Sequence, residues 1–174
     1  MKHNLTSVFF LFLVFTTIAQ EMKSEAKALP NSTKTLSGIV SSAYQGISGE
    51  VDSSRELTKL KELYAPNAII FKNTSVDGKP SRQVLSVEEF FSGMSDIRES
   101  GFFEEEINRE IRVFGNIAQV WSTYQIRNKK NGPIISRGIN SMQLHFKDNR
   151  WWIVAWGWDG ESAENKIPAS FDAN

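Results

Sequence analysis

The chain has 174 residues, in which 20 Lys and Arg balance 20 Asp and Glu, and it contains no cysteine. This even charge gives no attraction for nucleic acid or for an anionic membrane, so we expect neither as a partner. The lack of cysteine excludes disulfides and a lipoprotein anchor, which needs a cysteine directly after its apolar leader. The length is sufficient for one domain held together by its own core.

The first residues have the pattern of a signal peptide. A basic start at Lys2 precedes an unbroken apolar run over Val8–Phe15, and small residues follow at Thr17 and Ala19. The run is shorter than the roughly 20 apolar residues that span a bilayer. A retained membrane anchor is the alternative, but polar sequence begins at Gln20. We therefore expect residues 1–19 to be cleaved near Ala19 or Gln20, export to the periplasm or the extracellular space, and no membrane span afterwards.

The rest of the chain divides into three parts. Residues 20–35 are polar and rich in Lys, Ser and Glu, which is typical of a linker. Residues 36–160 are predicted to form the domain, and residues 161–174 a C-terminal tail. At the start of the domain helix and coil both stay open, because Gly38 and Gly46 weaken a helix.

Two helices are predicted in the first half of the domain. One begins at Ser53 or Ser54 and ends at Pro66, with leucines at helical spacing on one face. The other begins at Ser86, where a serine three residues before Glu89 has the form of a capping box. Its apolar face consists of Phe90, Phe91, Met94 and Ile97.

Strands are expected in the remainder. A short strand over residues 68–71 precedes a loop over residues 73–80, with its turn at Asp77–Gly78. From Phe102 onward the apolar residues alternate, and the predicted strands are residues 102–114, 117–129, 134–147 and 151–158. The pairs between them that suit hairpin turns are Gly115–Asn116, Asn131–Gly132 and Asp148–Asn149. Helices followed by a meander predict an α+β domain, with helices packed on one face of an antiparallel sheet of four to five strands.

Alternation along the strands predicts which residues face the helices. We place a three-residue loop with a bulge at Asn131–Gly132, because a two-residue turn would send Arg137 and His145 inward. The polar residues that then face inward are Glu105, Arg109, Ser122, Tyr124, Asn140 and Asp159. The outer face carries Trp121, Trp152, Trp156 and Trp158. Tryptophans on an outer sheet face are typical of an interface, so we expect a homodimer there. The alternative is that the tail over Lys166–Phe171 folds back over them.

Four short segments carry a resemblance to a known family. They are Leu63–Ala68, Phe114–Ala118, the pair Arg137–Gly138, and Arg150–Val154. By their order and spacing, residues 36–160 resemble the nuclear transport factor 2-like superfamily, in its SnoaL-like and ketosteroid-isomerase-like bacterial branches. The resemblance implies a curved sheet wrapped around helices into a cone, a pocket at the open end, and frequent dimerisation through the outer sheet face.

The resemblance also implies where a catalytic base would stand. Ketosteroid-isomerase-like members carry a carboxylate just after the strand that corresponds to residues 68–71. This chain has Ile70-Phe71-Lys72-Asn73 there, with no acid. The departure argues against proton abstraction from that position.

The candidate site residues follow from the inner face and the pocket. The predicted ligand-binding residues are Tyr64, Phe71, Phe91, Arg109, Ser122, Tyr124 and Asn140. Asp159 or Glu105 is the candidate general base, if an apolar wall raises its pKa. The alternatives are a salt bridge between Glu105 and Arg109 at the sheet rim, and a hydrogen bond between Tyr124 and Asn140 inside the sheet.

The function stays open between two classes. His145 is the single histidine left after signal cleavage, and the sequence has no His or Cys cluster and no Gly-rich phosphate loop, so we expect no metal and no cofactor. A pocket without an evident base favours an exported domain that binds a small apolar molecule. The alternative is a small lyase or isomerase of the SnoaL-like or ketosteroid-isomerase-like kind.

Overall fold

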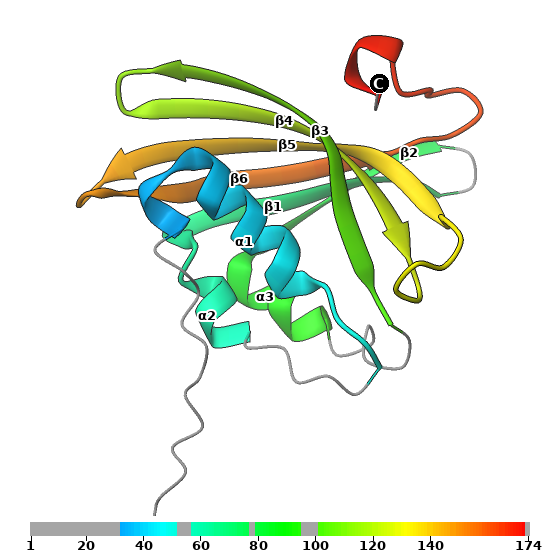
Figure 1. The fold of residues 1–174 in the computed structure, drawn as a ribbon, viewed down its shortest axis with the longest axis horizontal. Coiled ribbons are helices and arrows are strands. Elements are labelled where there is room, and N and C mark those ends of the chain that lie inside the picture. Colours follow the sequence, from blue (N-terminus) through cyan, green and yellow to red (C-terminus); the bar gives the residue numbers. More distant parts are fainter. Residues whose placement is uncertain (1–31, 52–56, 77–78, 95–100, 173–174) are drawn as a thin grey trace, which may run out of the picture.

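The computed structural model describes residues 32–51, 57–76, 79–94 and 101–172 (Figure 1). Its helical elements are η1 (Ser32–Lys34), α1 (Leu36–Ile47), α2 (Leu57–Lys61), α3 (Val87–Ser92) and η3 (Ala169–Phe171). Its strands are β1 (Tyr64–Val76), β2 (Lys79–Ser86), β3 (Phe103–Phe114), β4 (Ile117–Arg127), β5 (Ser136–Lys147) and β6 (Arg150–Gly160). The predicted signal peptide lies outside the described residues.

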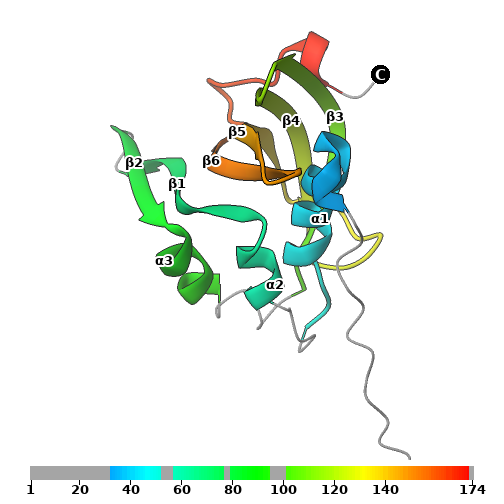
Figure 2. The same cartoon turned by 90° about the vertical axis from the view of Figure 1, so that its left-hand side faces the viewer.

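The strands form one curved sheet of six strands, in the order β2-β1-β6-β5-β4-β3. Strand β1 runs parallel to β6, and the other neighbours are antiparallel. The sheet bends around α1, α2 and α3, which all lie on its concave side (Figures 1 and 2). The predicted α+β architecture is confirmed, with six strands instead of four to five.

The additional strand comes from residues predicted to be a loop. Strand β1 continues to Val76 and pairs with β2 from Ile69↔Ser86 to Val76↔Lys79. The loop prediction for residues 73–80 was therefore wrong, and the predicted turn at Asp77–Gly78 lies outside the described residues. Strand β2 is an edge strand with Pro80 in it, and an edge strand has no second neighbour to impose an apolar alternation.

Helix α1 forms in spite of its two glycines. Thr35 caps it by accepting a hydrogen bond from the Gly38 amide at 3.0 Å. A Cβ on Gly46 would lie 2.0 Å from the Leu60 side chain, so this glycine allows α1 and α2 to pack closely. The helix then buries one complete apolar face, which consists of Ile39, Val40, Ala43, Tyr44 and Ile47.

The capping box at the start of α3 is confirmed. The Ser86 hydroxyl accepts from the Glu89 amide at 3.2 Å, and the Glu89 carboxylate accepts from the Ser86 amide at 2.7 Å. The predicted helix starts at Ser53 or Ser54, and the predicted helical position Ile97, lie outside the described residues.

Two β-bulges decide which side chains point to the concave side. In the β3–β4 pair, Glu106 faces Tyr124 and the next partners are Asn108 and Thr123, so Ile107 is an extra residue. In the β5–β6 pair, Gln143 faces Ala155 while Leu144 faces Ile153, so Val154 is extra. Each extra residue reverses the alternation of the strand on one side of the bulge.

These reversals correct several predicted orientations. Before the first bulge, Glu104 and Glu106 point to the concave side and Glu105 to the convex side. After the second bulge, Trp156 and Trp158 point inward and Asp159 outward. The predictions of an inward Glu105 and Asp159, and of outward Trp156 and Trp158, were therefore wrong.

The faces of β4 and β5 agree with the predicted alternation. The two-residue turn at Gly115–Asn116 is confirmed by the pairing of Val113 with Ala118. The loop around Asn131–Gly132 is longer than predicted, because β4 ends at Arg127 and β5 begins at Ser136. Ser122 still faces Asn140 across these strands, and both are buried on the concave side.

The C-terminal tail covers part of the convex face. The Phe171 ring lies 6.0 Å from the Trp121 ring, and the Phe171 carbonyl accepts from the Thr123 hydroxyl at 2.6 Å. Asp172 forms an ion pair with Arg137. The η3 segment lies on the side of the sheet opposite to the helices (Figure 1). The structure thus shows the alternative in which the tail folds back, and the homodimer stays a prediction.

Gly157→Ala tests the packing of β1 on β6. A Cβ on Gly157 would lie 2.0 Å from the Phe71 ring on the convex side. We expect a loss of ~1–3 kcal/mol in the free energy of unfolding by urea, as is usual for overpacking. The loss should vanish in a Phe71→Ala background.

Gly93→Ala is the matched control, because no atom lies within 4 Å of a Cβ at that position. If Gly93→Ala and Gly157→Ala reduced stability equally, the proposed contact of Phe71 with Gly157 would be contradicted.

Candidate functional site

The concave side of the sheet holds a cavity of about 440 Å³. Its walls are mostly apolar and aromatic, and come from all six strands, from α3 and from the end of α1. The residues that line it are Ile47, Tyr64, Ile70, Lys72, Gln83, Leu85, Glu89, Phe90, Gly93, Met94, Phe102, Glu104, Tyr124, Ile126, Asn140, Trp156 and Trp158. Lys72, Gln83 and Glu89 keep exposed surface and stand at the mouth, whereas Asn140 and Trp156 are buried in the floor.

Glu104 is positioned by its strand and by α1. The Ser48 hydroxyl, just after α1, donates to the Glu104 carbonyl at 3.2 Å and accepts from the Glu104 amide at 3.0 Å. A backbone bridge between Gly49 and Phe102 ties the same two segments together. Together with the bulge at Ile107, these contacts direct the Glu104 side chain into the cavity.

Asn140 in the cavity floor makes three hydrogen bonds. Its Nδ2 donates to Glu104 Oε1 at 2.9 Å and to the Tyr44 hydroxyl at 2.8 Å. Its Oδ1 accepts from the Trp156 indole Nε1 at 2.8 Å. Every donor and acceptor of this buried amide is therefore used, as the burial of a polar side chain requires.

The Glu104 carboxyl has an unusual ionisation. It is surrounded by protein atoms, although the residue keeps some exposed surface. Desolvation raises its pKa from 4.5 to about 7, against the lowering effect of the bond from Asn140. Its Oε2 has no hydrogen-bond partner among the described residues. A carboxyl group with one free oxygen at a cavity wall is placed to give or take a proton.

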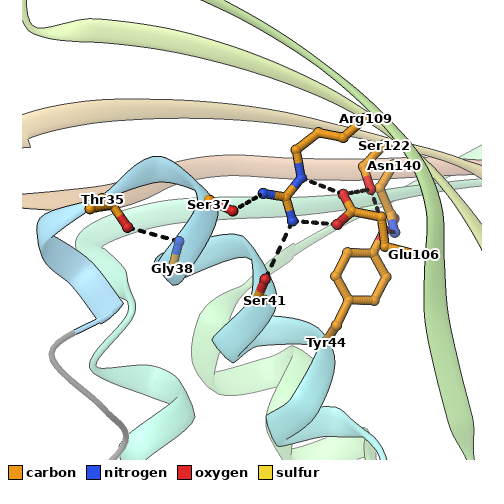
Figure 3. Close-up of polar contacts among 9 residues, drawn as sticks. All are labelled: Thr35, Ser37, Gly38, Ser41, Tyr44, Glu106, Arg109, Ser122 and Asn140. Carbon is orange, nitrogen blue, oxygen red and sulfur yellow. Dashed lines mark hydrogen bonds and ion pairs between the residues drawn. The ribbon is translucent and has the colours of Figure 1, made fainter.

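A hydrogen-bonded chain leads from Asn140 to the surface of α1 (Figure 3). Tyr44 OH lies 2.6 Å from Ser122 Oγ, and Ser122 Oγ donates to Glu106 Oε1 at 2.6 Å. Because the one hydroxyl hydrogen of Ser122 goes to Glu106, Tyr44 donates to Ser122. Arg109 then forms an ion pair with Glu106.

Arg109 connects this chain to α1. Its Nη1 donates to the Ser37 hydroxyl at 2.9 Å, and its Nη2 contacts the Ser41 hydroxyl at 3.5 Å (Figure 3). The guanidinium of Arg109 therefore links β3 to the first turns of α1 through two serines on one helix face.

Two further tyrosines face the cavity. Burial raises the pKa of Tyr64 and of Tyr124 well above their usual value, and the nearby Glu104 carboxylate adds to both effects. Both side chains are therefore neutral at physiological pH. Neither hydroxyl has a hydrogen-bond partner among the described residues, so each can donate to a molecule in the cavity.

Three of the predicted ligand-binding residues line the cavity, namely Tyr64, Tyr124 and Asn140. The other four lie elsewhere: Ser122 and Arg109 belong to the hydrogen-bonded chain, Phe91 is in the core against the Tyr64 ring, and Phe71 is on the convex face. The two polar contacts that were considered as alternatives form with other partners. Arg109 pairs with Glu106 instead of Glu105, and Asn140 bonds to Tyr44 instead of Tyr124.

The two candidate bases are on the convex side. Glu105 accepts hydrogen bonds from Gln125 and Arg127, both at 2.8 Å, and these bonds lower its pKa. Asp159 is exposed beside the tail. Sequence reasoning missed Glu104 and Trp156, because a one-residue bulge leaves no mark in the alternation of Glu104–Glu105–Glu106.

The predicted interface tryptophans have separate environments. Trp152 lies under the Arg150 guanidinium, 3.8 Å from the ring centroid, and Trp121 contacts the tail. Trp156 and Trp158 line the cavity on the concave side.

Other kinds of site have no support in the described part of the chain. Within it, no group of three or more His, Cys, Asp or Glu side chains could hold a metal ion. None of the helices described there has the length and apolar character needed to cross a membrane.

Comparison with known proteins identifies the fold. No protein-family model and no curated protein matches the sequence. Among solved structures, a candidate dehydratase of the NTF2-like family from Streptomyces avermitilis matches with a TM-score of 0.55 and 14% identity, over 76% of this chain and 98% of that one. An NTF2-like protein of unknown function from Shewanella baltica matches with a TM-score of 0.50 and 16% identity, over 72% and 90%.

This chain has the nuclear transport factor 2-like fold. A candidate ketosteroid isomerase from Parabacteroides distasonis also matches, with a TM-score of 0.50 and 14% identity, over 74% of this chain and 89% of that one. At such identities the likeness concerns the fold, and the NTF2-like architecture leaves the chemistry to the residues of the cavity.

The raised pKa of Glu104 predicts how the stability of this NTF2-like domain depends on pH. The folded state holds the proton more tightly than the unfolded state, so stability falls as pH rises from 4.5 to about 7. Glu104→Gln removes this effect. Relative to the wild type, we expect the variant to gain up to about 3 kcal/mol in free energy of unfolding between pH 4.5 and pH 8.

Glu105→Gln is the control, measured by urea unfolding over the same pH range. The pKa of Glu105 is lowered, so its effect on stability changes below pH 4.5 and its difference from the wild type should stay constant above pH 5. A constant difference for Glu104→Gln as well would contradict a raised pKa at Glu104.

Proposed function

We propose that the cavity binds a small, largely apolar molecule and that Glu104 moves a proton on it, as in an isomerase or a lyase. The observation that carries this proposal is the Glu104 carboxyl, which lines an apolar cavity, is held through Oε1 and has no hydrogen-bond partner at Oε2 among the described residues. The base considered from sequence alone was Asp159 or Glu105, and Glu104 takes that place.

Binding is supported by the size and lining of the cavity. About 440 Å³ lies within the range usual for small-molecule sites. Aromatic side chains at Trp156, Trp158 and Phe90 offer flat apolar surface, and the tyrosine hydroxyls offer a few directed donors. A small molecule with an apolar ring and one carbonyl oxygen fits this combination.

Proton transfer is supported by the ionisation of Glu104. A pKa of about 7 means that acid and base forms are both populated at neutral pH, which is the condition for efficient general acid–base catalysis. The carboxylate would remove a proton from a carbon next to the carbonyl. Tyr64 or Tyr124 would donate to the oxygen on which negative charge develops.

Two outcomes of this step are possible for the same residues. Return of the proton to another carbon completes an isomerisation, and departure of a group from the neighbouring carbon completes an elimination. Two of the similar structures are named a candidate isomerase and a candidate dehydratase, which are enzymes of these two kinds.

Export and self-association are proposed from the sequence. The pattern of residues 1–19 supports a cleaved signal peptide, and Trp121 and Trp152 remain on the convex face, where a second copy could bind. The tail contact of Trp121 means that a homodimer through this face would have to include or displace the tail.

Isomerisation of cyclohex-3-enone to the conjugated cyclohex-2-enone tests the proposal. The reaction needs a base that removes a proton beside the carbonyl and returns it at the far alkene carbon, and the product is detected by its ultraviolet absorbance. We expect the wild-type rate to rise with pH around a midpoint near 7. Glu104→Gln should lower it by roughly 10²- to 10⁴-fold, as for loss of a general base.

Glu105→Gln serves as the control and should keep the wild-type rate and midpoint, because Glu105 lies on the convex side. Equal rates for the wild type and Glu104→Gln would contradict proton transfer. If the ketone then still quenched tryptophan fluorescence in a saturable way, the cavity would have a binding function without turnover.

A further inference from the structure

The Trp156 side chain reaches the cavity floor because of the bulge at Val154. This extra residue turns Trp156 inward, opposite Met142, and places its indole Nε1 at 2.8 Å from Asn140 Oδ1. An indole N–H can donate a hydrogen bond but cannot accept one. The partner of Trp156 must therefore be an acceptor, and among the polar atoms of the Asn140 amide only Oδ1 qualifies.

The other end of the hydrogen-bonded chain sets the same orientation of the Asn140 amide. Arg109 keeps Glu106 as an acceptor, Ser122 gives its hydrogen to Glu106, and Tyr44 gives its hydrogen to Ser122. The Tyr44 oxygen is then left to accept from Asn140, which must present Nδ2. A flipped amide would place two donors face to face at Trp156 and leave Tyr44 without a donor.

We propose that Trp156 is a positioning residue, which acts through Asn140 by fixing the amide with its Nδ2 group directed at Glu104. In this orientation Glu104 Oε1 receives a hydrogen bond at 2.9 Å, and Oε2 is left without a partner among the described residues. The flipped amide would present Oδ1 to Glu104 instead. This oxygen can form a hydrogen bond only with the protonated carboxyl. The indole and Tyr44 thus hold the amide from two sides, in the orientation that stabilises the charged form of Glu104.

Other charged and titratable groups line the same cavity or belong to the hydrogen-bonded chain. They are Tyr44 on α1, Tyr64 and Lys72 on β1, Glu89 on α3, Tyr124 on β4 and Glu106 on β3. Replacement of Trp156 leaves all of them in the chain, so a change at Glu104 reports on the amide. The Tyr64 ring stacks on Trp156 at a centroid distance of 6.2 Å, and the aromatic substitution Trp156→Phe keeps a ring at that position.

The test compares Trp156→Phe with Trp158→Phe. Both tryptophans line the cavity, but the hydrogen bond to Asn140 comes from Trp156. In protein labelled with ¹³C at the glutamate carboxyls, we expect Trp156→Phe to raise the pKa of Glu104 by up to about one unit, which is the effect of losing a hydrogen bond to a charged group, because Tyr44 alone then holds the amide. Trp158→Phe should change it by much less.

The same substitution in an Asn140→Leu background tests whether Trp156 acts on Glu104 through the amide. If Trp156 acts through the amide, Trp156→Phe should no longer change the pKa of Glu104 once Asn140 is replaced. Equal shifts for the two tryptophan variants, or a shift that persists in Asn140→Leu, would overturn the proposal and show a general effect of cavity hydration.

A second measurement uses the wild type alone, so it tests the proposal even if the Trp156→Phe variant does not fold. In the wild type, the ¹⁵N–¹H signals of the Asn140 side-chain NH₂ should move with the Glu104 titration, and the Trp156 indole signal should move less. A larger response at the indole would contradict the orientation. The role of Trp156 rests on the proposed function of Glu104, but both tests measure the ionisation of the free protein, without substrate. A wild-type Glu104 that titrates near 7 with no effect of Trp156 would therefore leave the proposed function standing.

Discussion

The exposure of one carboxyl group to an apolar cavity is the constraint on which the rest of the site depends. Desolvation of Glu104 disfavours its charged form, and the bond from Asn140 offsets part of that cost. Asn140 is itself buried and needs Tyr44 and Trp156 as partners. Tyr44 in turn depends on the position of α1, which Arg109 ties to β3. Loss of Asn140 would leave the Trp156 indole without its partner, and loss of Tyr44 or Arg109 would remove one bond of a neighbour, so the network ties the helix, the sheet and the carboxyl together.

The sequence was sufficient to predict the regular pairing of β4 with β5 and the local signals of turns and caps. The turn at Asp148–Asn149 was recognised from its residues, and both adopt positive φ, at 53° and 60°. The inward placement of Tyr124 and Asn140 followed from alternation along β4 and β5, which pair with each other without a bulge. The capping box at Ser86 was also evident, because its hydrogen bonds are local and involve two residues three positions apart.

The chemistry of the site escaped prediction because it depends on two extra residues. Alternation assumes a constant period of two, and the bulges at Ile107 and Val154 each break it. One of them brings Glu104 inward instead of Glu105, and the other brings in Trp156. A bulge depends on the register between strands, and the side chains of Glu104–Glu105–Glu106 are chemically equivalent, so no residue type could reveal it. Bulges are frequent beside active sites, where they redirect a side chain, and both bulges here have that effect.

The central claim is that Glu104 ionises in contact with a cavity that accepts apolar molecules. The most direct measurement is the ¹³C chemical shift of the Glu104 carboxyl across pH, assigned by comparison with Glu104→Gln, with and without saturating cyclohexanone. The account predicts a midpoint near 7 in the free protein and a higher one with the ketone bound, because the ketone displaces water from around the carboxyl. A midpoint near 4.5, or one that the ketone leaves unchanged, would contradict it.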